Sequence, residues 1–346
     1  MIRITLGKSR IGYRCFSNLS FTRQELNINN NINNNNNTTN NDSIIIDNIK
    51  LPTVELINNS IANNTGLKGL FSDSTLKDLH NGQSMNLESL KEALSDSYYK
   101  NYIDSFKSQH KDASNNPIIG QYKNLLEKCS INYDNNSYIF DLSSNIYNYY
   151  YFTSILKSRS GELRKPNANA LLETNKISIN NIPTSPKFLS LIKSSFNSVE
   201  EFLTLLNDSI LSIKGNGNTW VTYNYVANSK TYENFKKLTI VNTYNNGSPY
   251  DLLSNRIQTG EEFNNRKNKS INQDNNSIRS DKHTIPTIKE AQKVNNFKFN
   301  SHPLFAIPSN PSYYLRDYGV YGKQEYIKNV LASIDWDIVQ SRADSN

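Results

Sequence analysis

The stretch Pro303–Arg342 reads PLFAIPSNPSYYLRDYGVYGKQEYIKNVLASIDWDIVQSR, and it predicts most of the C-terminal architecture. Its apolar run at 304–307 is typical of a short buried strand. The two prolines of the following PSNPS exclude a helix interior and indicate a turn. Residues 313–315 are expected to open a short helix. A second helix from about Gln324 carries apolar residues at spacings of three and four, and Trp336 and Val339 complete its apolar face.

The sequence upstream of this stretch predicts two helices followed by two strands. Residues 187–213 carry the clearest helical periodicity of the chain, and Ser198 with Glu201 three positions later forms a capping-box pattern. The segment GNGNTWVTYNYV at 215–226 predicts a glycine turn leading into a strand. The segment KKLTIVNTYNNGSP at 236–249 predicts a second strand that ends in a turn.

The N-terminal half favours helices. A Ser/Asp cluster at 72–74 suits a helix N-cap, and helices are expected at 87–107, 116–128 and 138–157. In the first of these, the predicted inward face is Leu87, Leu90, Leu94, Tyr98, Tyr102 and Phe106. The aromatic segment NIYNYYYFTSIL fits either core packing or a binding surface, and aromatic residues at helical spacing are more often core.

The chain divides by composition into five parts. We expect a mitochondrial presequence at 1–18, an Asn-rich disordered segment at 19–65 and a helical N-terminal domain at 66–160. A linker at 161–186 then leads to an α/β C-terminal domain at 187–342, which contains a disordered insertion at about 255–296. The expected fold class is α+β, with a small antiparallel sheet in the C-terminal domain.

The basic residues are concentrated at the N-terminus. Five of them, Arg3, Lys8, Arg10, Arg14 and Arg23, precede the first acid, Glu25, and subtracting them from the net charge of +7 leaves +2. This composition is typical of a mitochondrial transit peptide, although a basic N-terminus of a cytosolic protein has the same appearance. The near-neutral remainder weakens an argument for nucleic-acid binding from bulk charge alone.

Cysteine and hydropathy patterns exclude further classes. Cys15 lies in the predicted presequence, so Cys129 would be the only cysteine of the mature chain, which leaves neither an internal disulfide nor a cysteine zinc cluster. No run reaches 18 apolar residues, so the sequence predicts a soluble or peripherally bound protein without a membrane span.

Four short motifs resemble iron/manganese superoxide dismutases in their order and spacing. Ser195–Phe202 is similar to that family's D-F-G-S-F-E-x-F, and Gly215–Val221 to its G-S-G-W-x-W-L. Lys237–Asn246 is similar to K-L-x-V-x-x-T-x-N-Q, and the segment containing Tyr313–Leu315 to W-E-H-A-Y-Y-L. The resemblance covers most of residues 66–342 and implies a superoxide-dismutase-like fold.

The same resemblance implies that the metal site has been lost. The family binds manganese or iron through three histidines and one aspartate, and a glutamine orients the bound water. The aligned positions of one histidine, the aspartate and the last histidine hold Tyr149, Ile307 and Pro311, and the glutamine position holds Asn246. The first histidine falls near Leu79, His80 or Leu94. One imidazole cannot hold these ions, so no metal or cofactor is expected and the chain is not expected to be an enzyme.

A fold that is kept without its metal site points to a scaffold. The chain resembles the longer of two superoxide-dismutase-like proteins of the fungal mitochondrial small ribosomal subunit. The stretches that carry this likeness are Gly69–Ser72, Leu171–Thr174, Asn242–Asn245 and Asp317–Lys323. The resemblance implies a structural role in mitochondrial translation, a matrix location, contact with small-subunit rRNA and ribosomal proteins, and a heterodimer with the second such protein.

Two alternatives remain open on the sequence. The chain could be a free matrix RNA-binding or translation factor, or an active superoxide dismutase with displaced ligands. The basic insertion supplies candidate RNA contacts at Arg266, Lys267, Lys269, Arg279 and Lys282, although a charge run of this kind is usually a solvated loop.

Overall fold

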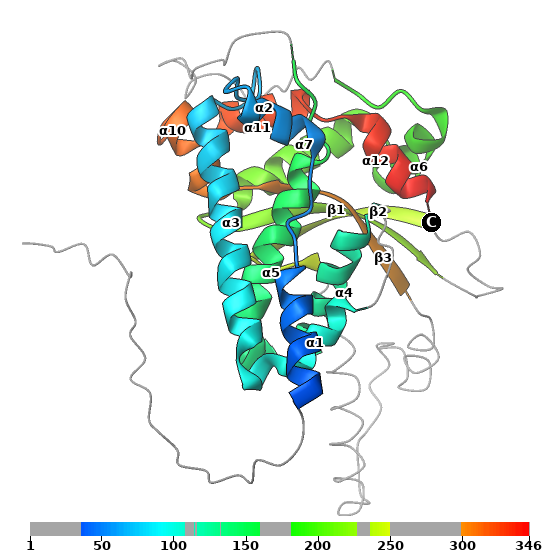
Figure 1. The fold of residues 1–346 in the computed structure, drawn as a ribbon. Helices are drawn as coiled ribbons and strands as arrows, with labels where there is room; N and C mark the ends of the chain where they lie inside the picture. The colour runs from blue at the N-terminus through cyan, green and yellow to red at the C-terminus, as the bar shows by residue number, and fades with distance from the viewer. Residues whose placement is uncertain are drawn as a thin grey trace, which may run out of the picture.

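The computed structural model describes residues 36–107, 114, 116–131, 133–159, 181–226, 236–249 and 299–345. Helices dominate the N-terminal half, and a sheet followed by short helices forms the rest, so the fold class is α+β (Figure 1). The helices of the N-terminal half are α1 (Asn36–Asp47), α2 (Glu55–Ala62), α3 (Asp73–Ser95), the 3-10 helix η1 (Ser97–Phe106), α4 (Pro117–Ile131) and α5 (Tyr133–Thr153). The helices of the C-terminal half are α6 (Pro186–Phe196), α7 (Val199–Ser212), the 3-10 helix η3 (Pro311–Tyr313), α10 (Leu315–Tyr318), α11 (Lys323–Ala332) and α12 (Trp336–Asp344).

The sheet contains three antiparallel strands in the order β2-β1-β3, and each was expected from the sequence. They are β1 (Gly217–Val226), β2 (Lys236–Tyr244) and β3 (Phe299–Pro308). The central strand pairs Trp220 with Val241 on one side and with Ala306 on the other. The threonine hydroxyls of Thr222 and Thr239 lie 2.7 Å apart across β1 and β2. Such cross-strand pairs help to fix the register.

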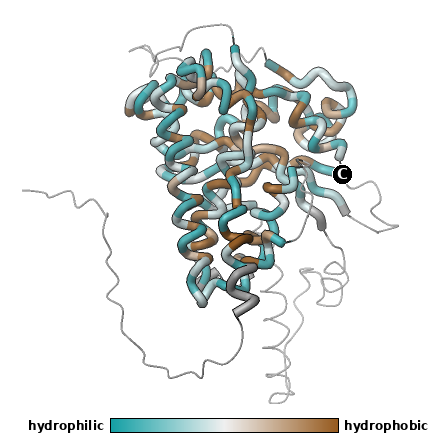
Figure 2. Tube along the Cα trace, viewed as in Figure 1, coloured by the Kyte–Doolittle hydropathy of each residue, from teal (hydrophilic) through white to brown (hydrophobic). Residues whose placement is uncertain are grey.

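Side-chain alternation along the strands separates two hydrophobic clusters. Trp220 and Ala306 belong to a cluster with the aromatic residues Tyr147 and Tyr151 of α5. Their neighbours Val221 and Phe305 belong to a second cluster with residues of α7, α11 and α12. Because successive strand residues point to opposite faces, the sheet is buried on both sides. In Figure 2, where the trace is coloured by hydropathy, hydrophobic segments accordingly lie in the interior of the fold.

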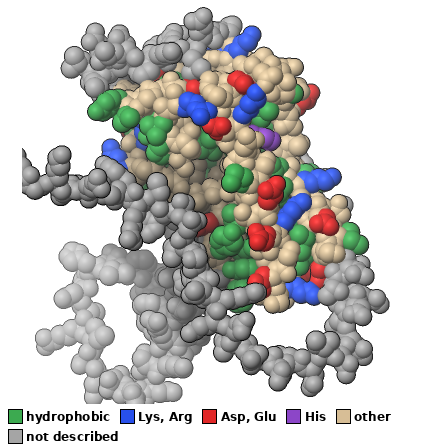
Figure 3. Space-filling model, turned by 60° about the vertical axis from the view of Figure 1, so that its left-hand side comes forward, with side chains coloured by type: hydrophobic (Ala, Val, Ile, Leu, Met, Phe, Trp, Pro, Cys, Tyr) green, Lys and Arg blue, Asp and Glu red, His purple; other side chains and the backbone are tan. Residues whose placement is uncertain are grey.

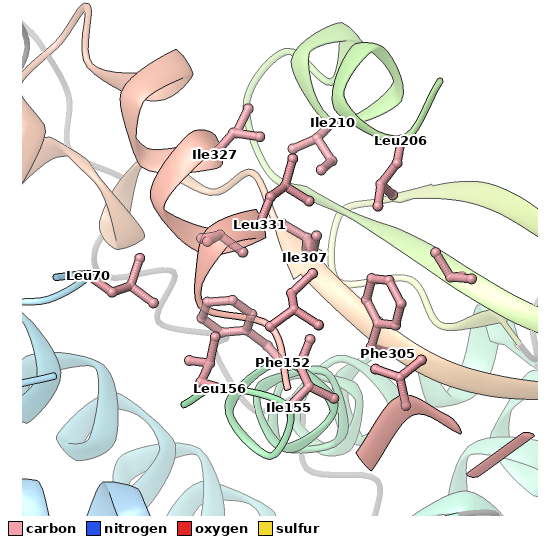
Figure 4. Packing of buried hydrophobic residues seen from close by; sticks show 14 of the residues in the cluster. Leu70, Phe152, Ile155, Leu156, Leu206, Ile210, Phe305, Ile307, Ile327 and Leu331 are labelled. Carbon is pink, nitrogen blue, oxygen red and sulfur yellow. The ribbon is translucent and has the colours of Figure 1, made fainter. Parts of the chain in front are cut away.

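The helical half and the sheet half share one core. The second cluster joins Leu70, Phe152 and Leu156 from the N-terminal half to Phe305 and Ile307 on β3 (Figure 4). A backbone bridge also pairs Leu156 with Ile334. The helix packing within the N-terminal half is visible in Figure 1, where α1 and α5 run beside α3.

Local signals explain where the main helices begin. Ser72 accepts a hydrogen bond from the backbone N–H of Thr75 at the start of α3, at 3.2 Å. Ser198 does the same for Glu201 at the start of α7, at 2.9 Å. Each serine thus satisfies one of the unpaired donors of the first helical turn, as the sequence predicted for both sites.

Two expectations about the N-terminal half were wrong. Disorder was expected over 19–65, yet α1 and α2 lie within the described part of this segment, 36–65, and bury Ile46 and Ile57, whereas residues 19–35 lie outside the described residues. A salt bridge of 3.2 Å between Lys100 and Asp42 further attaches α1 to η1. Disorder was expected because asparagines dominate the composition of this segment. Its few isoleucines are nevertheless enough to pack both helices against the helical bundle.

The helix expected at 87–107 ends at Ser95 instead. Asp96 has extended backbone angles, and its side chain accepts a hydrogen bond from the N–H of Tyr98 at 3.0 Å, which starts η1. Tyr98 is therefore exposed rather than on the inward face. An aspartate side chain that competes for local backbone donors is the physical reason for the break.

The end of the predicted linker is ordered. Asn181 donates hydrogen bonds to the carbonyl oxygens of Leu331 at 3.1 Å and Ile334 at 2.7 Å, and its own carbonyl accepts from the Trp336 indole at 3.0 Å. The predicted presequence at 1–18, residues 161–180 of the linker and the insertion at 255–296 lie outside the described residues.

Candidate functional site

Two of the positions aligned with the metal ligands, Tyr149 and Ile307, lie in one buried cluster, whereas Pro311 is half-buried beside it in sequence. Helix α5 places Tyr149 and Phe152 toward strand β3, whose Ile307 has an exposed fraction of 0%. Pro308 ends that strand, and Asn310 caps the following 3-10 turn by accepting from the N–H of Ser312 at 3.0 Å. The turn begins at Pro311 and brings Tyr313 into the same cluster.

Among the three candidates for the first ligand position, Leu79 joins this cluster. Leu94 belongs to the other hydrophobic cluster, beside Leu90. His80 follows Leu79 on α3, and successive helical residues point about 100° apart, so His80 faces a different direction from Leu79. Its side chain is half-buried, and this burial lowers the pKa of the imidazole.

Two tyrosines occupy the space between these elements. Tyr313 packs edge-on against Phe152, with ring centroids 5.6 Å apart. Burial raises the pKa of Tyr149 and of Tyr313, and the charge of an ionised Tyr149 would raise the pKa of Tyr313 further. Within the described part of the chain, the hydroxyl of Tyr149 is buried without a hydrogen-bond partner.

The glutamine-equivalent position is part of an asparagine network at the ends of the strands. Asn246 Oδ1 accepts from Asn216 Nδ2 at 2.9 Å, and Asn216 Oδ1 accepts from Asn310 Nδ2 at 3.2 Å. The backbone carbonyl of Asn246 accepts from Ser144, and that of Gly247 accepts from Asn148 Nδ2 at 3.3 Å. The network links helix α5 to three loops.

Backbone geometry explains why asparagine suits this loop. Asn245 and Asn246 adopt the left-handed φ values of 49° and 63°. Apart from glycine, asparagine is among the residues that enter this region most readily. Asn216 and Asn310 were not singled out from the sequence as a network, because asparagines in NGN and SNP turns look like ordinary loop residues. Their occurrence beside strand ends was the available signal.

A buried arginine ties the cluster to the C-terminal helix. Arg342 on α12 is 3% exposed; its guanidinium donates to the carbonyl of Leu304 at 2.5 Å and to the Ser154 hydroxyl at 2.6 Å. It also lies 4.8 Å from the centroid of the Tyr151 ring, within cation–π range. In the sequence, the one signal for this residue is its place at the end of the pattern I-D-W-x-x-V-x-x-R at 334–342.

The side chains of this cluster pack against one another and offer few atoms that could act as ligands. The side chains of Leu79, Ile307 and Pro311 carry no atom that could coordinate a metal ion, and Tyr149 offers a single phenol. Among the residues that the structure describes, no group of three or more His, Cys, Asp or Glu side chains is placed to hold a metal ion.

The candidate RNA contacts Arg266, Lys267, Lys269, Arg279 and Lys282 lie outside the described residues. No helix in the described ranges is both long and apolar enough to cross a lipid bilayer. No protein-family model matches the chain.

Proposed function

We propose that this chain is a structural constituent of the mitochondrial small ribosomal subunit, built on a superoxide-dismutase-like fold that has lost its metal chemistry. Its role is that of a scaffold in mitochondrial translation, located in the matrix, with no catalytic residue. Its partners are small-subunit rRNA, ribosomal proteins and a second dismutase-like chain with which it forms a heterodimer.

The convergence of the aligned ligand positions carries the proposal. Leu79, Tyr149 and Ile307 come from α3, α5 and β3, and they meet in one buried cluster together with Tyr313. Three aligned positions that converge in this way are what an ancestral metal site between a helical half and a sheet half would leave behind. The aliphatic replacements at two of them favour a scaffold over an enzyme.

The asparagine network supports the same interpretation. In the enzymes, the position of Asn246 orients a metal-bound water, whereas here its side chain accepts from Asn216 in a network that holds loops together. Arg342 likewise clamps α12 to β3 and α5. Polar side chains near the former site thus serve the rigidity of the fold.

Sedimentation tests the proposed function. Mitochondrial lysate is separated on a sucrose gradient at moderate salt, and fractions are probed for this protein and for small-subunit rRNA. We expect the two to migrate together, and to shift together when Mg²⁺ is removed and the subunits dissociate. A peak at the top of the gradient would overturn the proposal and favour a free matrix factor.

Metal analysis of the purified chain tests the enzyme alternative. We expect manganese and iron far below one ion per chain, and no superoxide consumption above that of a buffer control. Near-stoichiometric metal together with measurable dismutation would instead establish an enzyme with displaced ligands.

A further inference from the structure

The turn before α11 displays two large exposed side chains on a rigid base. Val320 is 73% exposed and Tyr321 is 80% exposed, and glycines flank the pair. The N–H of Gly322 donates to the carbonyl of Gly319 at 3.1 Å, which closes a tight turn. This arrangement holds an aromatic ring in solvent without support from a hydrophobic neighbour across the turn.

Two glycines and a buried tyrosine fix the conformation of this turn. Gly319 has a left-handed φ of 76°, and a Cβ atom at Gly322 would lie 2.1 Å from the carbonyl oxygen of Tyr318. The hydroxyl of Tyr318 donates to the carbonyl of Leu70 at 2.6 Å and accepts from Asn329 Nδ2 at 3.1 Å. A preordered turn loses little conformational entropy when a ligand binds.

Two lysines lie beside the turn. Lys323 follows Tyr321 by two residues, and its Nζ donates to the carbonyl of Ile213 at 2.6 Å, immediately before the exposed Lys214. Burial, and secondarily the charge of Lys214, lower the pKa of Lys323 to about 8. The nearest acid on α11, Glu325, forms a salt bridge with Lys328 at 3.8 Å.

The ligand that suits this arrangement carries both an aromatic surface and negative charge. Because Lys323 Nζ donates to the residue before Lys214, the two lysines are neighbours that can share one anion, and an exposed ring gains from stacking. An unpaired nucleotide provides both, because its base can stack on tyrosine while its phosphate meets the lysines. The face that carries α3 and α10 shows hydrophobic side chains among charged ones (Figure 3).

We infer that Tyr321, Lys323 and Lys214 form a binding site for an unpaired nucleotide of RNA, in which the tyrosine stacks on the base and the two lysines hold a phosphate. The identity of that RNA as small-subunit rRNA rests on the proposed function, whereas the site itself does not. A hydrophobic protein partner would cover Val320 and Tyr321 but would offer no anion to the two lysines.

Binding to a defined oligonucleotide tests the site on the purified full chain. The probe is a fluorescein-labelled single-stranded 12-nucleotide oligouridylate, compared with a fully paired RNA hairpin of similar charge. We expect Tyr321→Ala to weaken single-strand binding about fivefold or more, because one stacked base is lost. Tyr321→Phe keeps the ring, so its affinity should stay within about twofold of wild type, and neither variant should change hairpin binding.

The lysines are tested by salt dependence. For Lys214→Ala/Lys323→Ala we expect weaker binding and a log–log salt slope reduced by about 0.7, since the two lysines share one phosphate and each phosphate contact on a single strand contributes about 0.7. The matched control is Lys128→Ala/Lys193→Ala, which removes the same charge from two exposed positions and should leave the salt slope unchanged. Lys214→Ala alone serves if the double variant folds poorly.

Two results would overturn the inference. The first is that both Tyr321→Ala and Lys214→Ala keep the wild-type affinity and salt slope. The second is that a photoreactive amino acid placed at position 321 forms crosslinks to protein rather than to RNA in mitochondrial particles. Either result is compatible with co-sedimentation, so the proposed function would survive. Conversely, the protein could stay at the top of the gradient and still bind the oligonucleotide through Tyr321. That pair of results would overturn the proposed ribosomal function and support the nucleotide site.

Discussion

At the scale of single residues, the phenol of Tyr149 is a buried polar group in an otherwise apolar cluster. Its hydroxyl is buried without a partner among the described residues, whereas that of Tyr318 is bonded to Leu70 and Asn329. We expect Tyr149→Phe to leave the free energy of unfolding unchanged or to raise it by up to about 1 kcal/mol. Tyr318→Phe should lower it by about 1–3 kcal/mol. Urea denaturation of both variants measures the difference, and equal losses would contradict it.

Ile307 tests whether the cluster is a packed core. Ile307→Val should lower the free energy of unfolding by about 1 kcal/mol, because one methylene is lost. Ile307→Asp should lower it by about 3 kcal/mol or more, because the carboxylate would be buried among apolar side chains. Both values come from chemical denaturation. A stable Asp variant would indicate that water reaches this position.

Restoring the aligned ligands should not restore chemistry. Tyr149→His/Ile307→Asp/Pro311→His still lacks a ligand at Leu79, and Asn246 remains bonded to Asn216. Metal sites depend on such surrounding residues. We expect no measurable superoxide consumption and no retained manganese or iron after gel filtration. Activity in this triple variant would mean that the surrounding residues can support a metal site after all.

At the scale of elements, two glycines should respond oppositely to alanine. Gly82 lies inside α3, and a Cβ atom there would meet nothing within 4 Å, so Gly82→Ala should stabilise the protein by about 1 kcal/mol. At Gly322 the same change places Cβ against the Tyr318 carbonyl and should destabilise the start of α11. Thermal unfolding of the two variants gives the comparison. A rise in the melting temperature of Gly322→Ala would show that the turn can rearrange.

Sequence patterns predicted some elements well and others poorly. Strands β1 and β2 were predictable because alternation and a flanking turn coincide, and the apolar run of β3 sits before two prolines. Helix α1 was missed because burial of Ile46 depends on a bundle that is distant in the sequence. The break at Ser95 was missed because apolar spacing continues through it while Asp96 redirects the backbone.

The residues of the candidate site were likewise only partly predictable from the sequence. The resemblance located Tyr149 and Ile307, but only the three-dimensional structure distinguishes Leu79 from Leu94, since both lie on the inward side of α3. Arg342 carries a charge near a helix end, where solvent exposure is usual, so its burial was not predictable. Its partners come from β3 and α5.

At the scale of the whole molecule, the buried tyrosines determine the response to alkali. Burial is the main cause that raises the pKa of Tyr122, Tyr149, Tyr313, Tyr318 and Tyr326. The folded state therefore favours the neutral phenols. Their contribution to stability is complete below the unfolded pKa of about 10 and is lost as the pH rises above it.

We therefore expect cooperative unfolding above about pH 10, in which phenolate absorbance and loss of helical circular dichroism change together. Full ionisation of the tyrosines in a chain that keeps its helical signal would contradict this expectation.

The central place of β1 between β2 and β3 constrains how the protein is made. Strand β3 and helix α12 complete both the sheet and the arginine clamp, yet a ribosome delivers them after everything that they cover. Until then the only sheet residues available to α5 are Trp220 and its neighbours on the first two strands, and pairing across such sequence separations is slow. The residues from Phe299 onward, which are synthesised last, therefore decide when the core closes, and a chain that stops short of them would leave apolar surface exposed.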